Sequence, residues 1–405
     1  MPHNNITSAC IVCNQLRASG GSRRRPARRR RNARGRFHVR CVPRRVFLVA
    51  LILIALCGCG LQDWFALLSC PADLPPAPQA DDSLPPEFTR VSVPSSPEGG
   101  LPFPYNHTAS IVEASNGVLL VAWGAGSYEL APDTRIVASR RAAGSSQWSA
   151  PVTLADKPGF ADANCVLFLD DVGMLHLYYV EMFGDNFCLG RTMQIDSTDA
   201  GATWSTPRPL LDAFCILLRN RPIITAGGIW ILPAYEQAVY QSQFWRSADR
   251  GASWQPSGKL FSVPLNLQPA VAQLADGSLF ALLRNGSKTG TLLDARGDAC
   301  GIAWAVRERD DLPNPNSGVE LIRLLTGELL AFYNDSATQR TPLVAALSTD
   351  GGESWSSPKI IADGPPQRSY PSAIQSADGR IHVVYSANLT HIEHVTFTRA
   401  WLLQP

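Results

Sequence analysis

The chain after residue 104 has few cysteines and no pattern that would bind a metal ion. Its four cysteines are Cys165, Cys188, Cys215 and Cys300, with no Cys-x-x-Cys pair or Cys/His cluster at zinc spacing. A structural zinc site needs such ligands at short spacings. We therefore expect no metal and no other cofactor. In an exported protein these cysteines could pair, but their spacing leaves the pairing open.

Acidic residues and lysine are absent from the first 45 residues, which contain 13 arginines. The remainder of the chain therefore has 23 basic residues against 34 acidic ones, a net charge of −11. A protein that binds nucleic acid needs a basic surface to contact phosphates. We interpret residues 1–45 as an Arg-rich disordered leader and exclude nucleic acid as a partner of the body.

The sequence has no apolar run of the ~20 residues that a transmembrane helix needs. The run over residues 46–56 continues through two cysteines to Leu61 and stops at Gln62. A run of this length behind a basic segment is typical of a signal peptide. Residues 56–59, Leu-Cys-Gly-Cys, also resemble a bacterial lipobox with Cys59 as the lipidated residue. Residues 46–61 are thus predicted to be a signal or anchor segment.

Two interpretations of residues 46–61 remain open. In the first, the segment is a signal peptide processed at Cys59, and translation begins near Val42, which leaves a short basic n-region before the apolar run. In the second, the segment is an uncleaved anchor with its basic tail in the cytoplasm. Both predict a protein that is exported to the cell envelope and associated with the membrane through its N-terminal segment.

Proline is frequent between this segment and the body. Ten prolines lie in residues 71–104. Proline favours an extended, semi-rigid chain. Residues 62–104 are therefore predicted to be a Pro-rich linker that holds a domain off a membrane surface.

From Tyr105 the chain repeats one unit six times. In each unit a polar residue opens an apolar segment that ends at a Gly turn, and a second apolar segment follows, as in a β-hairpin. The turn glycines are 49 to 56 residues apart: Gly117, Gly173, Gly228, Gly277, Gly327 and Gly379. Six such units predict an all-β fold, a six-bladed β-propeller of four-stranded blades over residues 105–405. A β-sandwich would not need so regular a period.

A second repeat, S-x-D-x-G-x-[ST]-W, starts at Ser197, Ser247 and Ser348. The first two starts are 50 residues apart and the last two are 101 apart, which is two periods. Ser and Asp side chains can bond the backbone of their own turn, and Gly supplies a positive φ. The Trp ring can be buried between neighbouring units. We predict that these residues hold blades together and take no part in chemistry.

This motif resembles the Asp-box of the sialidase (neuraminidase) superfamily, and the resemblance covers residues 105–397. It implies the same fold, a six-bladed β-propeller. Three further segments make the chain similar to a divergent bacterial branch of sialidase-like BNR proteins: Arg219-Asn220-Arg221-Pro222, Leu312-Pro313-Asn314-Pro315-Asn316-Ser317-Gly318 and Tyr333-Asn334-Asp335-Ser336.

The resemblance implies a binding site for an acidic sugar. Three arginines of the family hold the substrate carboxylate, which guanidinium groups do with bidentate geometry. Arg284 and Arg340 match the second and third of these arginines. His107 stands where the first belongs, and Arg219 is a candidate replacement cation.

The resemblance also implies catalytic residues. Tyr370 matches the tyrosine nucleophile of the family, which is an exception among glycosidases. Gln268 stands where the family has the glutamate that activates this tyrosine, and an amide cannot take up the proton. The acid/base belongs on the loop after the first hairpin, where Glu129 is our first candidate and Asp133 our second.

Other polar residues open inner strands and are expected to converge around the axis, where ligand pockets form. Asn164, Asn220, Gln268 and Asn316 are candidates to bind sugar hydroxyls, or else to bond the backbone at the strand starts. Glu236, beside Tyr235, is a spare candidate base.

Two classes of function remain open. The first is an exo-sialidase-like hydrolase of terminal acidic sugars, with sialic acid as the leading substrate or another anionic sugar cleaved by hydrolysis or elimination. The second is a propeller that binds glycans without turnover. Tyr370 and Glu129 favour the enzyme, whereas Gln268 favours the binder. The oligomeric state stays open.

Overall fold

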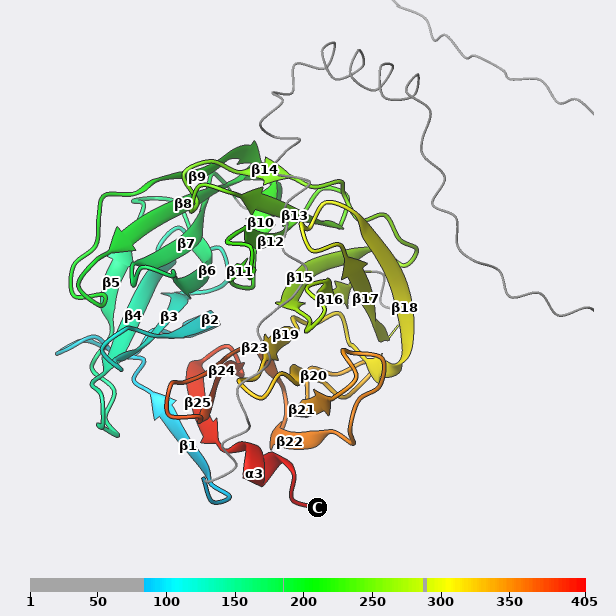
Figure 1. The fold of residues 1–405 in the computed structure, drawn as a ribbon. Helices are drawn as coiled ribbons and strands as arrows, with labels where there is room; N and C mark the ends of the chain where they lie inside the picture. The colour runs from blue at the N-terminus through cyan, green and yellow to red at the C-terminus, as the bar shows by residue number, and fades with distance from the viewer. Residues whose placement is uncertain (1–83, 185, 287–289) are drawn as a thin grey trace, which may run out of the picture. The chain divides into compact units, whose positions relative to one another are not determined.

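The computed structural model describes residues 84–184, 186–286 and 290–405. These residues form six antiparallel sheets, which Figure 1 shows in a ring around a central axis. The predicted six-bladed β-propeller is confirmed. The predictions for the leader, for residues 46–61 and for Cys59 lie outside the described residues. No helix in the described part of the chain is long and apolar enough to cross a membrane.

The first three blades follow one another in chain order, each from its inner strand outward. The first consists of β2 (Tyr105–Glu113), β3 (Leu119–Gly126), β4 (Arg135–Arg141) and β5 (Val152–Ala155). The second consists of β6 (Asp162–Leu169), β7 (Leu175–Met182), β8 (Gly190–Ser197) and β9 (Arg208–Phe214), with a 3₁₀ turn, η1 (Phe187–Leu189), before β8. The third consists of β10 (Ile216–Leu218), β11 (Ile223–Ile224), β12 (Trp230–Glu236), β13 (Gln241–Ser247) and β14 (Gln255–Pro256).

The last three blades complete the ring. The fourth consists of β15 (Asn266–Gln273), β16 (Leu279–Asn285), β17 (Thr291–Gly297) and β18 (Trp304–Pro313). The fifth consists of β19 (Glu320–Arg323), β20 (Leu329–Asn334), β21 (Leu343–Ser348) and β22 (Lys359–Ala362). The sixth consists of β23 (Arg368–Gln375), β24 (Ile381–Ala387), β25 (His391–Phe397) and β1 (Phe88–Val93), and α3 (Arg399–Leu402) follows β25.

Strand β1 closes the ring from the opposite end of the chain. It pairs antiparallel with β25 from Phe88 opposite Phe397 to Val93 opposite Ile392, so it is the outermost strand of the sixth blade. The predicted linker over residues 62–104 is therefore wrong for this stretch. Of the prolines that suggested a linker, Pro85, Pro86 and Pro94 flank the strand, where they remove no hydrogen bond of the sheet.

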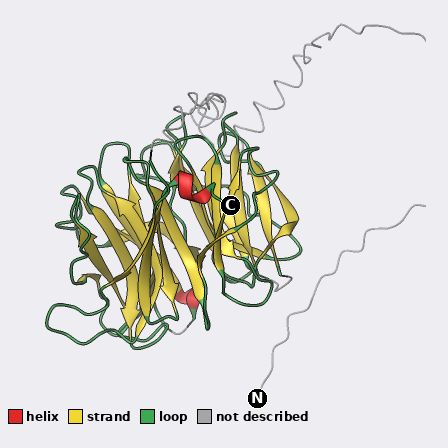
Figure 2. Ribbon diagram, turned by 90° about the horizontal axis from the view of Figure 1, so that it is seen from below, coloured by secondary structure: helices red, strands yellow, loops and turns green. Residues whose placement is uncertain are grey.

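The hydrophobic core lies between the blades. Six apolar clusters each join two consecutive blades, and one of them joins the sixth to the first through Ile374, Val384, Ile111 and Val121. Because both faces of a blade are covered, all eight residues of β3 are buried. In the view of Figure 2 the strands lie between two layers of loops, one at each face of the ring.

The three S-x-D-x-G-x-[ST]-W motifs form turns between the third and fourth strands of their blades. In the second blade Ser197 Oγ accepts a bond from Gly201 N at 2.8 Å, and Asp199 Oδ1 accepts one from Thr203 N at 2.8 Å. The same bonds recur at Ser247 and Ser348. Trp204, Trp254 and Trp355 pack against apolar clusters between blades. These contacts agree with the predicted structural role.

The fourth blade contains a turn of the same kind that the motif did not identify. Asp298 accepts bonds from the backbone N–H groups of Cys300, Ile302 and Ala303. Trp304 Nε1 donates to Gly301 O at 3.0 Å, as Trp204 Nε1 does to Gly201 O at 3.2 Å. Asp and Trp are one residue farther apart here than in the motif. The interval of 101 residues between the motifs at Ser247 and Ser348 therefore contains a further turn of this kind at its midpoint.

Candidate functional site

A pocket of about 280 Å³ lies at the end of the ring where the inner strands begin. Eight of the eleven residues predicted to act in catalysis or substrate binding line this pocket, and Asp133, Arg219 and Asn220 do not. The eight are His107, Glu129, Asn164, Gln268, Arg284, Asn316, Arg340 and Tyr370.

The inner strands direct these side chains into the pocket through an unusual backbone conformation. Thr108, Asn164, Gln268, Asn316 and Tyr370 have φ between 51° and 56°. Four of them lie at register shifts of β2, β6, β15 and β23. A bulge of this kind redirects a side chain out of its sheet. The repeated fold therefore presents one polar side chain from each of five blades to the pocket.

Arg284 is the centre of the hydrogen-bond network. Its Nη1 donates to Tyr370 Oη and to Gln268 Oε1, both at 2.8 Å, and its Nε donates to Asn316 Oδ1 at 2.7 Å. Arg284 is 9% exposed. A guanidinium held this firmly is oriented before a ligand arrives, which lowers the entropic cost of binding an anion.

Arg340 and His107 complete the surroundings of Tyr370. Arg340 Nη2 donates to Asn316 O at 3.1 Å, and its Cζ lies 5.4 Å from the centroid of the Tyr370 ring. The His107 ring lies edge-on to the same ring at 4.4 Å between centroids, and its Nδ1 is 2.8 Å from Ser386 Oγ. On the pocket side, two cations and one imidazole therefore lie beside the phenol.

Burial and the charges of the nearby arginines act on the pKa of both the phenol and the imidazole. Burial disfavours the charged phenolate, but the charges of the nearby arginines outweigh it and hold the pKa of Tyr370 below its ordinary value. Burial, followed by the same charges, holds the pKa of His107 well below its usual range. His107 is therefore neutral at pH 7 and cannot replace the charge of the family's first arginine.

The two candidate acids on the loop between β3 and β4 differ in position. Glu129 lines the pocket with an exposed side chain. Asp133 instead accepts bonds from Ser127 Oγ at 2.6 Å and Ser127 N at 3.2 Å, and these bonds lower the pKa of Asp133. Asp133 therefore fixes the loop that presents Glu129.

Arg219 and Asn220 lie below the pocket, in the break between β10 and β11. Arg219 Nη2 donates to Tyr370 O at 2.8 Å and Pro371 O at 2.9 Å. Asn220 Nδ2 donates to Pro269 O at 2.9 Å and Gln268 O at 3.3 Å. Both side chains thus bind backbone carbonyls of other blades. The expectation that they contact substrate does not agree with these positions.

Tyr235 lines the pocket and was not among the predicted site residues. Its Oη accepts bonds from Asn164 Nδ2 and Gln268 Nε2, both at 3.3 Å. The repeat contained a signal for it, since Tyr235 follows Gly228 by seven residues, as Arg284 follows Gly277. The neighbouring Glu236, the spare candidate base, does not line the pocket and forms an ion pair with Lys259.

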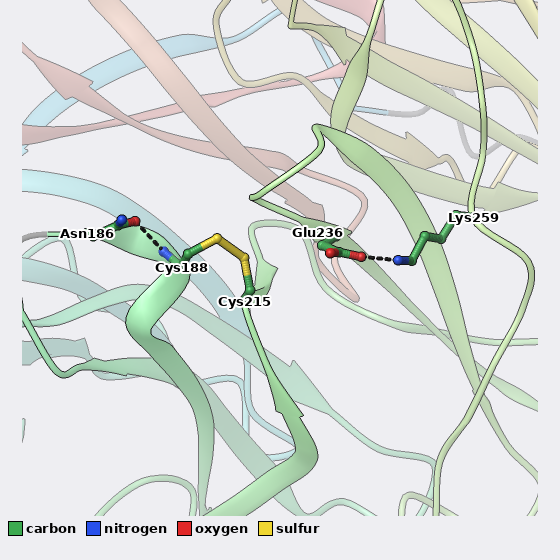
Figure 3. Close-up of a disulfide and its surroundings, with 5 residues drawn as sticks. All are labelled: Asn186, Cys188, Cys215, Glu236 and Lys259. Atoms are coloured by element: carbon green, nitrogen blue, oxygen red, sulfur yellow. Dashed lines mark hydrogen bonds and ion pairs between the residues drawn. A yellow bond between two sulfur atoms is a disulfide. The ribbon is translucent and has the colours of Figure 1, made fainter. Parts of the chain in front are cut away.

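A disulfide supports one wall of the pocket. It joins Cys188 in η1 to Cys215 between β9 and β10, as Figure 3 shows. Phe187, beside the first cysteine, lines the pocket, and so does Gln237, whose N–H donates to Cys215 O at 3.0 Å. The disulfide therefore couples pocket residues of the second and third blades. Cys165 is a free, buried cysteine.

A larger cavity of about 370 Å³ lies between the inner strands of the third to sixth blades. It is lined mainly by aliphatic side chains, with Arg221, Arg323, Gln273 and Gln375 as its polar residues. No carboxylate or tyrosine is among its lining residues within the described ranges. The smaller pocket at Tyr370 is therefore the better candidate for a reaction site. No cluster of three or more possible metal ligands occurs in the described part of the chain.

Comparison with known proteins relates the chain to a family. Residues 117–383 match the BNR repeat-like domain family. The chain is 26% identical over 240 residues to a sialidase of Micromonospora viridifaciens, which covers 51% of this chain and 35% of that protein. The chain thus spans about a third of that relative's length.

Solved structures show the same fold. The Hadza microbial sialidase Hz136 superposes with a TM-score of 0.64 at 16% identity, covering 73% of this chain and 66% of that one. An α-L-arabinanase of Penicillium chrysogenum, complexed with arabinobiose, superposes with a TM-score of 0.57 at 16% identity, covering 76% of this chain and 97% of that one. With the family match over residues 117–383, the chain belongs to the BNR repeat-like domain family, as a divergent member of the sialidase-like superfamily.

Proposed function

We propose that the protein is a glycoside hydrolase that removes a terminal acidic sugar from a glycan, with sialic acid as the leading substrate. The observation that supports this most is the bond from Arg284 to Tyr370 Oη at 2.8 Å, with Arg340 beside the same ring. The proposed nucleophile thus has neighbouring cations that can bind a carboxylate. The resemblance to sialidases supplies the leading substrate.

The reaction follows from these positions. Tyr370 Oη, as phenolate, attacks the anomeric carbon while the bond to the leaving oxygen breaks, and Glu129 donates its proton to that oxygen. Water then attacks the same carbon, Glu129 takes a proton from the water, and the phenolate is released. Arg284 and Arg340 hold the sugar carboxylate in both steps. A hydrolase of this kind needs no cofactor.

The second candidate function is glycan binding without turnover. It is favoured by Gln268, whose amide stands where the family has a carboxylate and here accepts a bond from Arg284. An amide can orient the guanidinium but cannot remove the proton of Tyr370. An anionic sugar other than sialic acid, cleaved by hydrolysis or elimination, would use the same arginines.

The test is turnover of a fluorogenic α-sialoside by the purified chain. We expect Arg284→Ala and Tyr370→Phe each to lower kcat/KM by about 100-fold or more, because each removes a buried, charge-assisted contact. Arg296→Ala is the matched control, since Arg296 belongs to the same blade but pairs with Glu353 at the surface. Activity equal to wild type in both site variants would reject the assignment.

A glycan-binding assay distinguishes the second candidate function from the first. If the wild-type chain has no turnover but binds acidic glycans on an array, and Arg284→Ala abolishes that binding, the protein is a binder or acts on another acidic sugar. If it shows neither activity nor binding, the site assignment is wrong and only the fold stands.

We also propose that the protein is exported and held at the cell envelope by its N-terminal segment, with the propeller outside the cytoplasm. The disulfide between Cys188 and Cys215 supports this, because such bonds persist in oxidising compartments. Protease added to cells whose outer envelope has been permeabilised, with the cytoplasmic membrane intact, should digest the propeller. Protection of the propeller until the cytoplasmic membrane is lysed would contradict export.

A further inference from the structure

Arg219 is a buried cation below the pocket. Its side chain is 2% exposed, and it occupies the break in the inner strand of the third blade. Its Nη2 donates to two backbone carbonyls, Tyr370 O and Pro371 O, and its Nε has no hydrogen-bond partner among the described residues. No carboxylate of the described residues lies within ion-pair distance of Arg219: Glu320 pairs with Arg221 at 3.9 Å, although its charge still raises the pKa of Arg219. A buried charge without a direct counter-ion is costly.

Besides the buried carboxylate of Glu320, the phenol of Tyr370 can carry a negative charge that compensates Arg219. The Cζ atom of Arg219 lies 5.4 Å from the centroid of the Tyr370 ring, as close as that of Arg340 and closer than that of Arg284 at 5.7 Å. The three guanidinium groups come from three blades, and Tyr370 belongs to a fourth. An opposite charge at such a distance favours the ionised form of a phenol.

Other titratable groups near Tyr370 are few. The first blade contributes His107, which is neutral, Tyr105 and the carboxylate of Glu129, which opposes ionisation. The third contributes Tyr235, whose pKa burial raises to about 12, so it remains neutral. With Arg219, Arg284 and Arg340, the surroundings contain three cations and one anion.

We infer that Arg219 is a positioning residue that holds the backbone of Tyr370 and, with Arg284 and Arg340, stabilises its ionised phenolate in place of a carboxylate base. With its pKa lowered, the phenol can lose its proton to solvent without an internal base, so Gln268 is compatible with a reactive tyrosine. The ionisation is a property of the free protein, whereas its use in catalysis rests on the proposed function.

The ionisation can be measured without any substrate. Phenolate absorbs near 295 nm, so the difference between pH titrations of the wild-type chain and of Tyr370→Phe isolates Tyr370 from the other tyrosines. We expect its midpoint below the ordinary value of about 10. A midpoint at or above this value would overturn the inference, whether or not the protein is an enzyme.

Variants of Arg219 then test its contribution to the ionisation of Tyr370. Arg219→Gln removes the charge and should raise the midpoint by about one pH unit or more. Arg219→Lys keeps the charge and should stay within a few tenths of a unit of wild type. The matched control is Arg221→Gln, which removes a nearby guanidinium that donates to Ala373 O; its midpoint should equal that of wild type. Equal midpoints in Arg219→Gln and wild type would show that Arg219 has no part in the ionisation.

Catalysis gives an independent readout. If the protein turns over a sialoside, the acidic limb of its pH–rate profile should move to higher pH in Arg219→Gln, in step with the spectroscopic midpoint. A lowered rate with an unmoved limb would mean that the variant is damaged only structurally. If Arg219→Gln does not fold, the difference titration of Tyr370→Phe still decides the ionisation, and Arg219→Met, which keeps an apolar side chain of similar length, removes the charge in its place.

Discussion

Tyr370 and Thr108 have φ of 56° and 54°, in the left-handed region that aromatic and β-branched residues seldom adopt. Such a conformation costs of order 1–3 kcal/mol and persists only where the surroundings impose it. At Tyr370 the bonds from Arg219 to the carbonyls of residues 370 and 371 supply part of this constraint. The conformation of Tyr370 is therefore stabilised in part by a residue 151 positions away in the chain.

At the same scale, we predict that Glu129 and not Asp133 is the acid. Glu129→Gln should lower kcat/KM by about 10²–10⁴-fold for a substrate whose leaving group must be protonated. It should have much less effect on a sialoside with a good leaving group, because such a group departs without a proton. The measurement is kcat/KM of Glu129→Gln and wild type on one substrate of each kind.

Asp133→Asn is the matched variant for this comparison. It weakens the bonds that Asp133 accepts from Ser127, so both substrates should be affected alike. A dependence on the leaving group in Asp133→Asn, with none in Glu129→Gln, would assign the acid to Asp133.

At the scale of elements, the turn around Gly201 joins β8 to β9 and contacts the preceding blade. Gly201 has a φ of +75°, and a Cβ atom at this position would collide with Leu120 of β3. The residue needs both the positive φ and the absence of a side chain. The turn therefore ties the second blade to the first.

We predict that Gly201→Ala destabilises the protein by about 2 kcal/mol or more, as a sum of backbone strain and overpacking. Thermal or denaturant unfolding would measure this. Gly144→Ala is the control, because Gly144 has a similar φ of +72° but no atom within 4 Å of an added Cβ. Equal losses in the two variants would show that the contact with Leu120 contributes nothing.

The elements also show how far the sequence predicts this molecule. The strand–Gly–strand period identified six blades because each hairpin is local in the chain. It did not identify β1, whose sequence Phe-Thr-Arg-Val-Ser-Val is mostly exposed and whose partner strand is near the other end of the chain. A pairing over that distance has no local signal.

The sequence likewise predicted only part of the site. The rule that polar residues open the inner strands placed His107, Gln268 and Tyr370 correctly in the pocket. It failed at Arg219 and Asn220 because it locates the backbone and says nothing of side-chain direction. In the third blade the inner strand is interrupted before Pro222, and both side chains turn to carbonyls of other blades.

At the scale of the whole molecule, the ring depends on the pairing of β1 with β25. Six residue pairs join the two strands, and Arg380 in the sixth blade forms an ion pair with Glu87 at 3.0 Å. Without β1, β25 would become an edge strand with unpaired backbone groups. The closing strand should therefore contribute to the stability of the entire propeller.

We predict that a chain beginning at residue 97 unfolds at a clearly lower temperature than one beginning at residue 84, and aggregates more readily. The shorter chain lacks β1, whereas the longer one lacks only residues before the described part. Calorimetry and light scattering would compare them. The same unfolding temperature for both would mean that the contacts between blades close the ring without this strand.

The pairing of β1 with β25 also determines when the protein can be completed. The bond from Glu87 N to Thr398 Oγ1 joins residues 311 positions apart. At ordinary rates of synthesis the ribosome needs about 15–60 s to make the chain between them. Among the described residues, the first strand to be made is therefore the last to find its partner, and throughout this time its backbone is open to other strands. An exported chain would benefit from this delay, since it must cross the membrane before its ring is locked.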